Sequence, residues 1–173
     1  LTAAKNPRRL ADELNGTLLP CETIRLPNSG QINKLPGYED GLWWVQDFSA
    51  ALAAKTLGSL AGKRVLDLCA APGGKTAQLI AAGADVTALD VSAARLETLK
   101  INLLRLKMSA RIICADAASY LKDFKDAPYD AVLLDAPCSA TGTIRRHPEL
   151  VHIKTAADVD KQVALQKQIL NVV

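Results

Sequence analysis

The sequence brings a carboxylate and a thiol together directly after a predicted buried strand. Asp135-Ala-Pro-Cys-Ser-Ala-Thr-Gly142 follows the apolar run Ala131-Val-Leu-Leu134. Open α/β sheets bind their ligands at the carboxyl ends of the strands. We therefore expect Asp135 to contact a ligand. Cys138 is placed to act as a nucleophile.

A glycine-rich turn lies earlier in the chain, where Asp67-Leu-Cys-Ala-Ala-Pro-Gly-Gly-Lys-Thr76 joins a strand to a helix. Gly73 and Gly74 have no Cβ atom, so the turn can adopt unusual dihedral angles and a ligand can approach its backbone. The first amides of the following helix point toward whatever is bound there. These features predict a cofactor-binding loop.

Three cofactors compete for this loop, and its spacing separates them. Gly74-Lys-Thr76 favours a P-loop nucleoside triphosphatase, but the phosphate cradle of that class needs a glycine five residues before Gly74, where this chain has Cys69. A nicotinamide or flavin site needs GxGxxG, which the segment beginning at Cys69 lacks. S-adenosylmethionine carries no phosphate and needs no such cradle, so it is the cofactor that we predict.

Four aspartates close the four successive predicted strands and should lie at one edge of the sheet: Asp67, Asp90, Asp116 and Asp135. Asp90 can accept hydrogen bonds from ribose hydroxyls, as the acid after a second strand does in dinucleotide sites. Asp116 can face the adenine amine. Each aspartate taken alone also fits a helix cap or a turn. Their common position favours a binding site.

Strands and helices alternate from Lys63 onward, which is typical of an α/β protein with a doubly wound parallel sheet. The predicted strands are 64–69, 85–89, 111–115 and 131–135, and the predicted helices are 76–82, 93–107, 118–122 and 158–173. Residues 1–45, which are rich in proline and glycine, form a lead-in segment with a short helix and short strands. Residues 46–173 form the core and begin with an alanine-rich helix.

Trp43 and Trp44 are adjacent on a short predicted strand, so their side chains should face opposite ways. We expect at least one of them to pack against the core rather than to stack on a base. His147 and His152 have a spacing that does not suit a helical metal pair, and we predict no metal site.

Composition sets the broad class of the protein. The chain has 173 residues, of which 49% are hydrophobic, and a net charge of +3. This mildly basic balance permits contact with nucleic acid without demonstrating it. No apolar run is long enough to span a membrane and no secretory signal is visible, so we expect a cytoplasmic protein. The four cysteines lie far apart and should be free thiols.

The two ends of the chain also carry information. Position 1 is Leu1 rather than Met, and the helix predicted over 158–173 ends without a cap. We therefore expect these residues to be a piece of a longer protein, truncated after the fourth core strand and its helix.

The two long motifs, together with Arg145-Arg146-His-Pro148, closely resemble those of the RNA cytosine-5 methyltransferase family, and within it the bacterial Sun/Fmu group that acts on 16S ribosomal RNA. Gln46-Asp47 also fits the beginning of that family's catalytic core. The resemblance covers the chain from about residue 7 to its end. It implies a Rossmann-like class I methyltransferase fold and S-adenosyl-L-methionine as cofactor. The residues to which it assigns cofactor binding are Cys69, Ala70, Ala71, Pro72, Gly73, Gly74, Lys75, Asp90, Asp116 and Asp135.

The chemistry of such an enzyme explains why a thiol and an acid are needed. C5 of cytosine is a poor nucleophile, so a cysteine thiolate must first add to C6. The resemblance places Asp135 beside N3 of the base, where it stabilises charge on the ring. Because the base must leave its stack, we expect single-stranded or loop RNA as the substrate. Arg145 and Arg146 are candidates for holding RNA phosphates beside it.

The resembling family uses two cysteines, and this chain contains the equivalent of only one. Cys138 matches the cysteine that assists product release, whereas the attacking cysteine lies in a Thr-Cys-Ser motif that is absent from the sequence. Cys69 and Cys114 end apolar strands and are expected to be buried core thiols. We therefore expect these 173 residues to bind cofactor without methylating RNA. Two alternatives remain: a non-catalytic module that binds S-adenosylmethionine or RNA, and attack by Cys138 itself.

Overall fold

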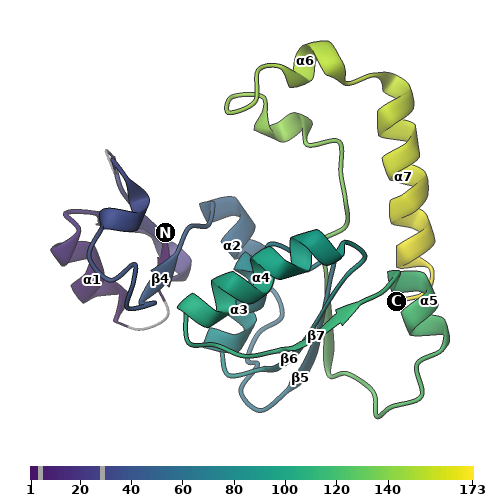
Figure 1. Ribbon diagram of the computed structural model, residues 1–173, viewed down its shortest axis with the longest axis horizontal. Helices are drawn as coiled ribbons and strands as arrows, with labels where there is room; N and C mark the ends of the chain where they lie inside the picture. Colours follow the sequence, from purple (N-terminus) through teal and green to yellow (C-terminus); the bar gives the residue numbers. More distant parts are fainter. Residues whose placement is uncertain (4–5, 28–29) are drawn as a thin grey trace.

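The computed structural model describes residues 1–3, 6–27 and 30–173, and its centre is a parallel four-stranded sheet (Figure 1). The strands are β5 (Arg64–Leu68), β6 (Asp85–Asp90), β7 (Arg111–Cys114) and β8 (Ala131–Leu134), in the order β7-β6-β5-β8. The sequence order reverses at β5, which pairs with β6 on one side and with β8 on the other. This is the doubly wound α/β arrangement that the sequence predicts.

Helices cover the sheet because its central strands are apolar on both faces. They are α2 (Phe48–Lys55), α3 (Gly74–Ala81), α4 (Ala93–Arg105), α5 (Ala117–Lys122) and α7 (Ala156–Leu170). Leu99 and Leu103 of α4 pack in one apolar cluster, whereas Leu66 of β5 packs in another that includes Ile169 of α7. Val65 and Leu66, which are neighbours on β5, are both fully buried.

Short polar side chains fix where several helices begin. Ser92 accepts a hydrogen bond from the backbone N–H of Arg95 at the start of α4, and Asp47 accepts one from Ser49 at the start of α2. Thr155 and Asp158 form a reciprocal capping box at the start of α7. These caps satisfy amides that have no partner within the helix.

The lead-in segment forms small elements beside the sheet domain. They are β1 (Thr2–Ala3), α1 (Pro7–Glu13), β2 (Thr17–Leu18), η1 (Pro20–Glu22), β3 (Ile24–Arg25), η2 (Ile32–Lys34) and β4 (Trp43–Trp44). β1 pairs antiparallel with β4, and β2 with β3. Trp43 packs in the apolar cluster of this segment, whereas Trp44 packs against the core, so the expectation that they face opposite ways is confirmed. Both are buried.

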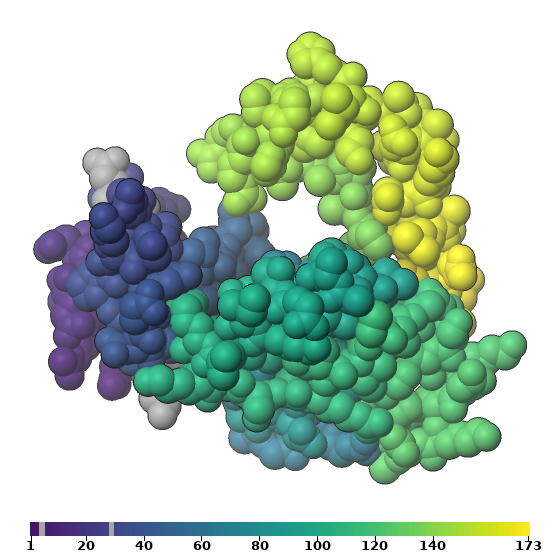
Figure 2. All heavy atoms as spheres, viewed as in Figure 1, coloured from purple at the N-terminus to yellow at the C-terminus, as the bar shows by residue number. Residues whose placement is uncertain are grey.

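The chain after β8 leaves the sheet domain before it returns. It passes through η3 (Thr141–Thr143) and α6 (Leu150–Ile153) and comes back along α7 (Figure 1). Figure 2 shows an opening between this segment and the sheet domain. Ile169 of α7 is buried, but Val159 and Val163 are each 39% exposed. The apolar face predicted for this helix therefore exists, and only its carboxyl-terminal end packs on the core.

No helix in the described part of the chain is long and apolar enough to cross a lipid bilayer.

Candidate cofactor and catalytic site

A cavity of about 280 Å³ lies at the carboxyl ends of the strands. Its lining includes Asp90 at the end of β6, Asp116 after β7, and Asp135, Pro137 and Cys138 after β8. The sequence predicted that the aspartates would share one edge of the sheet, and the structure brings these three to one cavity. We refer to this cavity as the first pocket.

Asp90 is 1% exposed, and its carboxylate contacts both the glycine-rich loop and the start of α4. One carboxylate oxygen accepts a hydrogen bond from the backbone N–H of Ser92 at 3.0 Å. The other accepts one from the backbone N–H of Ala71 at 3.2 Å and lies 3.3 Å from a guanidinium nitrogen of Arg95. Arg95 also donates to the carbonyl oxygen of Ala71. The aspartate therefore fixes the loop at the pocket wall.

Asp116 combines the two roles that the sequence left open. Its Oδ1 accepts hydrogen bonds from the backbone N–H and the hydroxyl of Ser119, so it caps the amino terminus of α5. The same residue lines the first pocket. Capping holds its carboxylate in place at the pocket wall, so the structural role and the proposed binding role are compatible.

A second pocket, of about 210 Å³, lies on the other side of Asp135. Its lining includes Gln46, Asp47, Asp67 and Lys75, and it shares Cys69, Ala71 and Asp135 with the first pocket. Nζ of Lys75 lies 2.6 Å from a carboxylate oxygen of Asp135. Because Lys75 is only 16% exposed and Asp135 is 53% exposed, the pair presents its carboxylate side to solvent. The shared residues make the two pockets neighbours at one site.

Gln46 is held in the second pocket by a chain of polar side chains. The indole N–H of Trp44 donates to Oε1 of Gln46 at 2.9 Å, and Nε2 of Gln46 donates to Oε1 of Gln78 at 3.0 Å. Gln78 in turn donates to the carbonyl oxygen of Ala51 in α2. This chain connects the end of the lead-in segment to α3 and α2, so Gln46 has a fixed position at the pocket wall.

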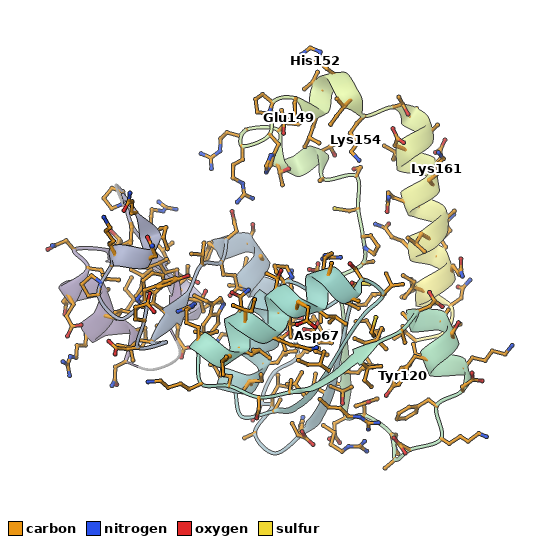
Figure 3. All side chains as sticks on the ribbon, viewed as in Figure 1. Asp67, Tyr120, Glu149, His152, Lys154 and Lys161 are labelled. Carbon is orange, nitrogen blue, oxygen red and sulfur yellow. The ribbon has the colours of Figure 1, made fainter. Side chains whose placement is uncertain are left out.

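Asp67 is the next-to-last residue of β5, lies within the sheet domain (Figure 3) and is completely buried. Oδ2 accepts a hydrogen bond from the hydroxyl of Thr76 at 2.6 Å, whereas Oδ1 has no hydrogen-bond partner among the residues that the structure describes. Burial raises the pKa of Asp67 to about 7, and the Thr76 hydrogen bond opposes that rise. The sequence placed Asp67 among the strand-end aspartates without giving it a separate role. The burial of its carboxyl group depends on tertiary packing that the sequence pattern does not show.

The two glycines of the loop have different roles, and the unusual dihedral angle expected of this turn is at Gly73. Gly73 has φ +100°, and a Cβ atom there would lie 3.0 Å from Cγ of Leu99. It is therefore needed both for its backbone conformation and for close packing against α4. Gly74 is the first residue of α3, and the nearest atom to a Cβ there would be a Trp44 carbon at 4.0 Å.

The cysteines at the sheet edge differ in exposure. Cys138 is exposed and lines the first pocket. Cys69 is half-buried, and desolvation raises the pKa of its thiol to about 11, which disfavours the reactive thiolate. The expectation that Cys114 is a buried core thiol was wrong, because it is exposed on β7, an edge strand paired only with β6. None of the four cysteines is in a disulfide.

Arg145 and Arg146 lie in the segment between η3 and α6, with Arg146 reaching back toward the core. A guanidinium nitrogen of Arg146 lies 3.5 Å from Oδ2 of Asp47, and both side chains are partly exposed. Between β8 and η3, the carbonyl oxygen of Pro137 accepts a hydrogen bond from Gln166 of α7 at 2.8 Å. These contacts connect the chain around Cys138 to α2 and to α7. The sequence did not predict the contact between Asp47 and Arg146.

This fold, with acidic strand ends and a glycine-rich turn at the reversal point of the sheet, defines a Rossmann-like class I methyltransferase, whose cofactor is S-adenosyl-L-methionine. The family of 16S rRNA methyltransferases described as RsmB/F matches residues 54–173. The chain belongs to that family.

Individual relatives and solved structures agree with this assignment. The chain is 45% identical over 158 residues to ribosomal RNA small subunit methyltransferase B of Pasteurella multocida, covering 87% of this chain and 35% of the relative. It is 42% identical over 152 residues to the protein of the same name from Vibrio cholerae, with the same coverage. The chain thus spans about a third of the length of these curated relatives.

Two solved structures from Pyrococcus horikoshii share the fold. NSun6, solved with SFG, superposes with a TM-score of 0.72 at 27% identity, covering 86% of this chain and 38% of that one. A methyltransferase homolog superposes with a TM-score of 0.77 at 25% identity, and the match covers 99% of this chain and 58% of that one.

Proposed function

We propose that this chain forms the cofactor-binding part of an enzyme that methylates C5 of a cytosine in 16S ribosomal RNA. The observation that carries the proposal is the pair of neighbouring pockets that meet at Asp135, with the exposed thiol of Cys138 at their edge. The family description, 16S rRNA methyltransferase, and the relatives named ribosomal RNA small subunit methyltransferase B support the substrate. The motif resemblance supports cytosine C5 as the atom that is modified.

The chemistry of the pockets fits S-adenosylmethionine. Three carboxylates, those of Asp90, Asp116 and Asp135, line the first pocket, and such a site favours a cationic ligand without phosphates. Asp67, a further acid, is among the residues that line the second pocket. When bound, the cofactor supplies a methyl group activated by a sulfonium.

We assign the two ends of the cofactor to the two pockets. Asp90 and Asp116 contact ribose and adenine in the first pocket. The backbone from Cys69 to Gly74, together with Lys75, holds the amino-acid end in the second. Asp135 borders both pockets and therefore lies beside the position where the methyl group is transferred.

The target base enters from the side of Cys138. Asp135 stabilises charge on the cytosine ring, and the thiol of Cys138 assists release of the methylated product. Arg145 and Arg146, on the outlying segment that follows, contact phosphates of single-stranded or loop RNA. Since the chain has no Thr-Cys-Ser segment, we propose that these 173 residues bind cofactor and do not methylate RNA by themselves.

Calorimetric titration with S-adenosylhomocysteine tests cofactor binding. We expect saturable binding that is at least tenfold weaker in Asp90→Asn and unchanged in Asp85→Asn, which alters an exposed aspartate at the opposite end of the same strand. Absence of binding by the unaltered chain, or equal effects of both substitutions, contradicts the proposed site.

The role of Cys138 is tested by trapping on 5-fluorocytosine RNA in the presence of S-adenosylmethionine. Because Cys138 is exposed beside Asp135, direct attack by its thiol is the second candidate mechanism. We expect no covalent complex with this chain. A complex that disappears in Cys138→Ala would identify Cys138 as the nucleophile and overturn the assignment to product release.

A further inference from the structure

The outlying segment, residues 139–153, carries η3 and α6 away from the sheet domain, and the chain returns through α7 (Figure 1). Among the residues that the structure describes, one ion pair joins a side chain of this segment to the sheet domain. A guanidinium nitrogen of Arg146 lies 3.5 Å from Oδ2 of Asp47. Asp47 precedes α2 and lines the second pocket, so the pair holds Arg146 at the pocket wall.

The carboxylate of Asp47 has a fixed orientation. Oδ1 accepts hydrogen bonds from the backbone N–H of Ser49 at 3.1 Å and from its hydroxyl at 2.7 Å. These bonds cap α2 and leave Oδ2 to face Arg146. The hydrogen bonds from Ser49, and more weakly the positive charges of Arg146 and Arg145, lower the pKa of Asp47. The carboxylate is therefore charged at neutral pH.

The guanidinium of Arg146 keeps its hydrogen-bonding capacity in this contact. The distance of 3.5 Å is longer than the about 2.7–2.9 Å of a charge-assisted hydrogen bond. The Arg146 side chain is 58% exposed and that of Asp47 is 42% exposed, so water and salt screen their attraction. A stronger acceptor can therefore replace Asp47 at a small cost in free energy.

RNA supplies such an acceptor. A guanidinium can donate two parallel hydrogen bonds to the oxygens of one phosphate, and neighbouring phosphates add further negative charge. We propose that Asp47 is a positioning residue that holds Arg146 beside the second pocket in the free protein and competes for it with an RNA phosphate. This inference rests on the proposed role of Arg146 in RNA binding and deepens it. When RNA replaces Asp47, the exchange also frees the outlying segment from α2.

Asp47→Asn separates this competition from the capping of α2. Asparagine is an equally good N-cap, and its side-chain oxygen can still accept from Ser49, but it presents no negative charge to Arg146. Binding of a fluorescein-labelled single-stranded RNA is measured by fluorescence anisotropy without cofactor. We expect Asp47→Asn to bind this RNA roughly two- to fivefold more tightly than the unaltered chain. Arg146→Gln should bind it more weakly, and adding Asp47→Asn to that variant should give no gain.

Asp126→Asn is the matched control. Asp126 also lies 3.5 Å from an arginine, Arg111, with both side chains exposed, and neither residue lines the two pockets. The substitution changes the net charge by the same amount as Asp47→Asn does. Because Arg111 has no proposed contact with RNA, we expect Asp126→Asn to bind the RNA as the unaltered chain does.

Amide hydrogen exchange in the absence of RNA provides a second measurement. We expect Asp47→Asn to accelerate exchange over residues 139–149 and Asp126→Asn to leave it unchanged. The role of Asp47 is overturned by unchanged exchange in Asp47→Asn, by no gain in its RNA affinity, or by an equal gain in Asp126→Asn or in the Arg146→Gln background. If Arg146→Gln binds RNA as well as the unaltered chain does, the proposed RNA contact itself fails, and this inference with it.

Discussion

The guanidinium of Arg105 donates to the carbonyl oxygen of Trp43 from both of its terminal nitrogens, at 3.2 and 3.1 Å. One of them also donates to the carbonyl oxygen of Tyr38 at 2.7 Å, and the guanidinium lies over the ring of Tyr38. Arg105 is the last residue of α4, so this side chain attaches the end of the lead-in segment to the sheet domain.

Replacement of Arg105 by lysine should loosen that attachment. The ammonium group of lysine cannot donate hydrogen bonds from two nitrogens in one plane, as the guanidinium does. We expect a loss of roughly 1–3 kcal/mol in the free energy of unfolding. Amide hydrogen exchange over residues 36–44 should accelerate. Arg111→Lys is the control, because Arg111 makes an exposed ion pair with Asp126 and should change little. Equal exchange rates in the two variants would contradict this account.

Gly41 should tolerate alanine much less well than Gly58, although their backbone conformations match. Their φ angles are +72° and +73°, but a Cβ atom at Gly41 would lie 2.2 Å from the carbonyl oxygen of Arg105, whereas one at Gly58 would meet nothing within 4 Å. We expect a cost of about 1 kcal/mol for Gly58→Ala and of roughly 3 kcal/mol or more for Gly41→Ala. Urea unfolding measures both. Similar costs would show that the close packing at Gly41 is unimportant.

Asp67 should make the stability of the protein depend on pH. Because its pKa is raised to about 7 from 3.8, the native state binds a proton more tightly than the unfolded state does. The resulting stability is present at low pH and is lost as pH rises from about 4 to 7, by an amount on the order of a few kcal/mol. Chemical unfolding from pH 5 to 8 should therefore show a loss in the unaltered protein that Asp67→Asn does not share.

Thr76 should tune that pH dependence. Its hydroxyl lowers the pKa of Asp67, so Thr76→Val should move the loss of stability to higher pH and should cost about 1–3 kcal/mol at pH 8. Thr76→Ser keeps the hydroxyl and should retain the original profile. A Thr76→Val profile that matches the unaltered one would show that the hydrogen bond does not act on the carboxylate.

The cysteines should react with iodoacetamide in an order set by exposure and thiol pKa. Cys114 and Cys138 are exposed, whereas Cys69 is half-buried and the pKa of its thiol is raised to about 11. At pH 8 we expect both exposed thiols to be alkylated well before Cys69. Peptide mass spectrometry after timed quenching gives the order. Early modification of Cys69 would mean that the loop opens readily.

Much of the fold could be predicted because the sheet is built from a regular alternation of strands and helices. Apolar runs marked each strand, and the residue after each run marked the edge where a ligand binds. Cys114 shows where this reasoning fails. Its apolar neighbours suggested a buried position, but exposure depends on strand order, and β7 lies at the edge of the sheet.

The other features that the sequence did not predict are contacts between distant residues. Nothing near Asp47 indicates that Arg146 will lie 3.5 Å away, because the intervening chain must first form the whole sheet. Likewise, the amphipathic pattern of α7 identified a helix, but it could not show that Ile169 packs while Val163 stays 39% exposed. The strand ends thus gave the location of the site, and tertiary packing determined its finer contacts.

The position of β8 next to β5 has a kinetic consequence. Val65 pairs with Ala131, so a long stretch of chain must be ordered before that side of the sheet can close, and such non-local pairing slows folding. Both pockets need Asp135, which follows β8, and are therefore incomplete until this last strand has docked. A ligand that recognises only the finished sheet cannot help it to assemble. Such a ligand can only slow the unfolding of the finished sheet. Bound cofactor should therefore lower the unfolding rate and leave the folding rate unchanged.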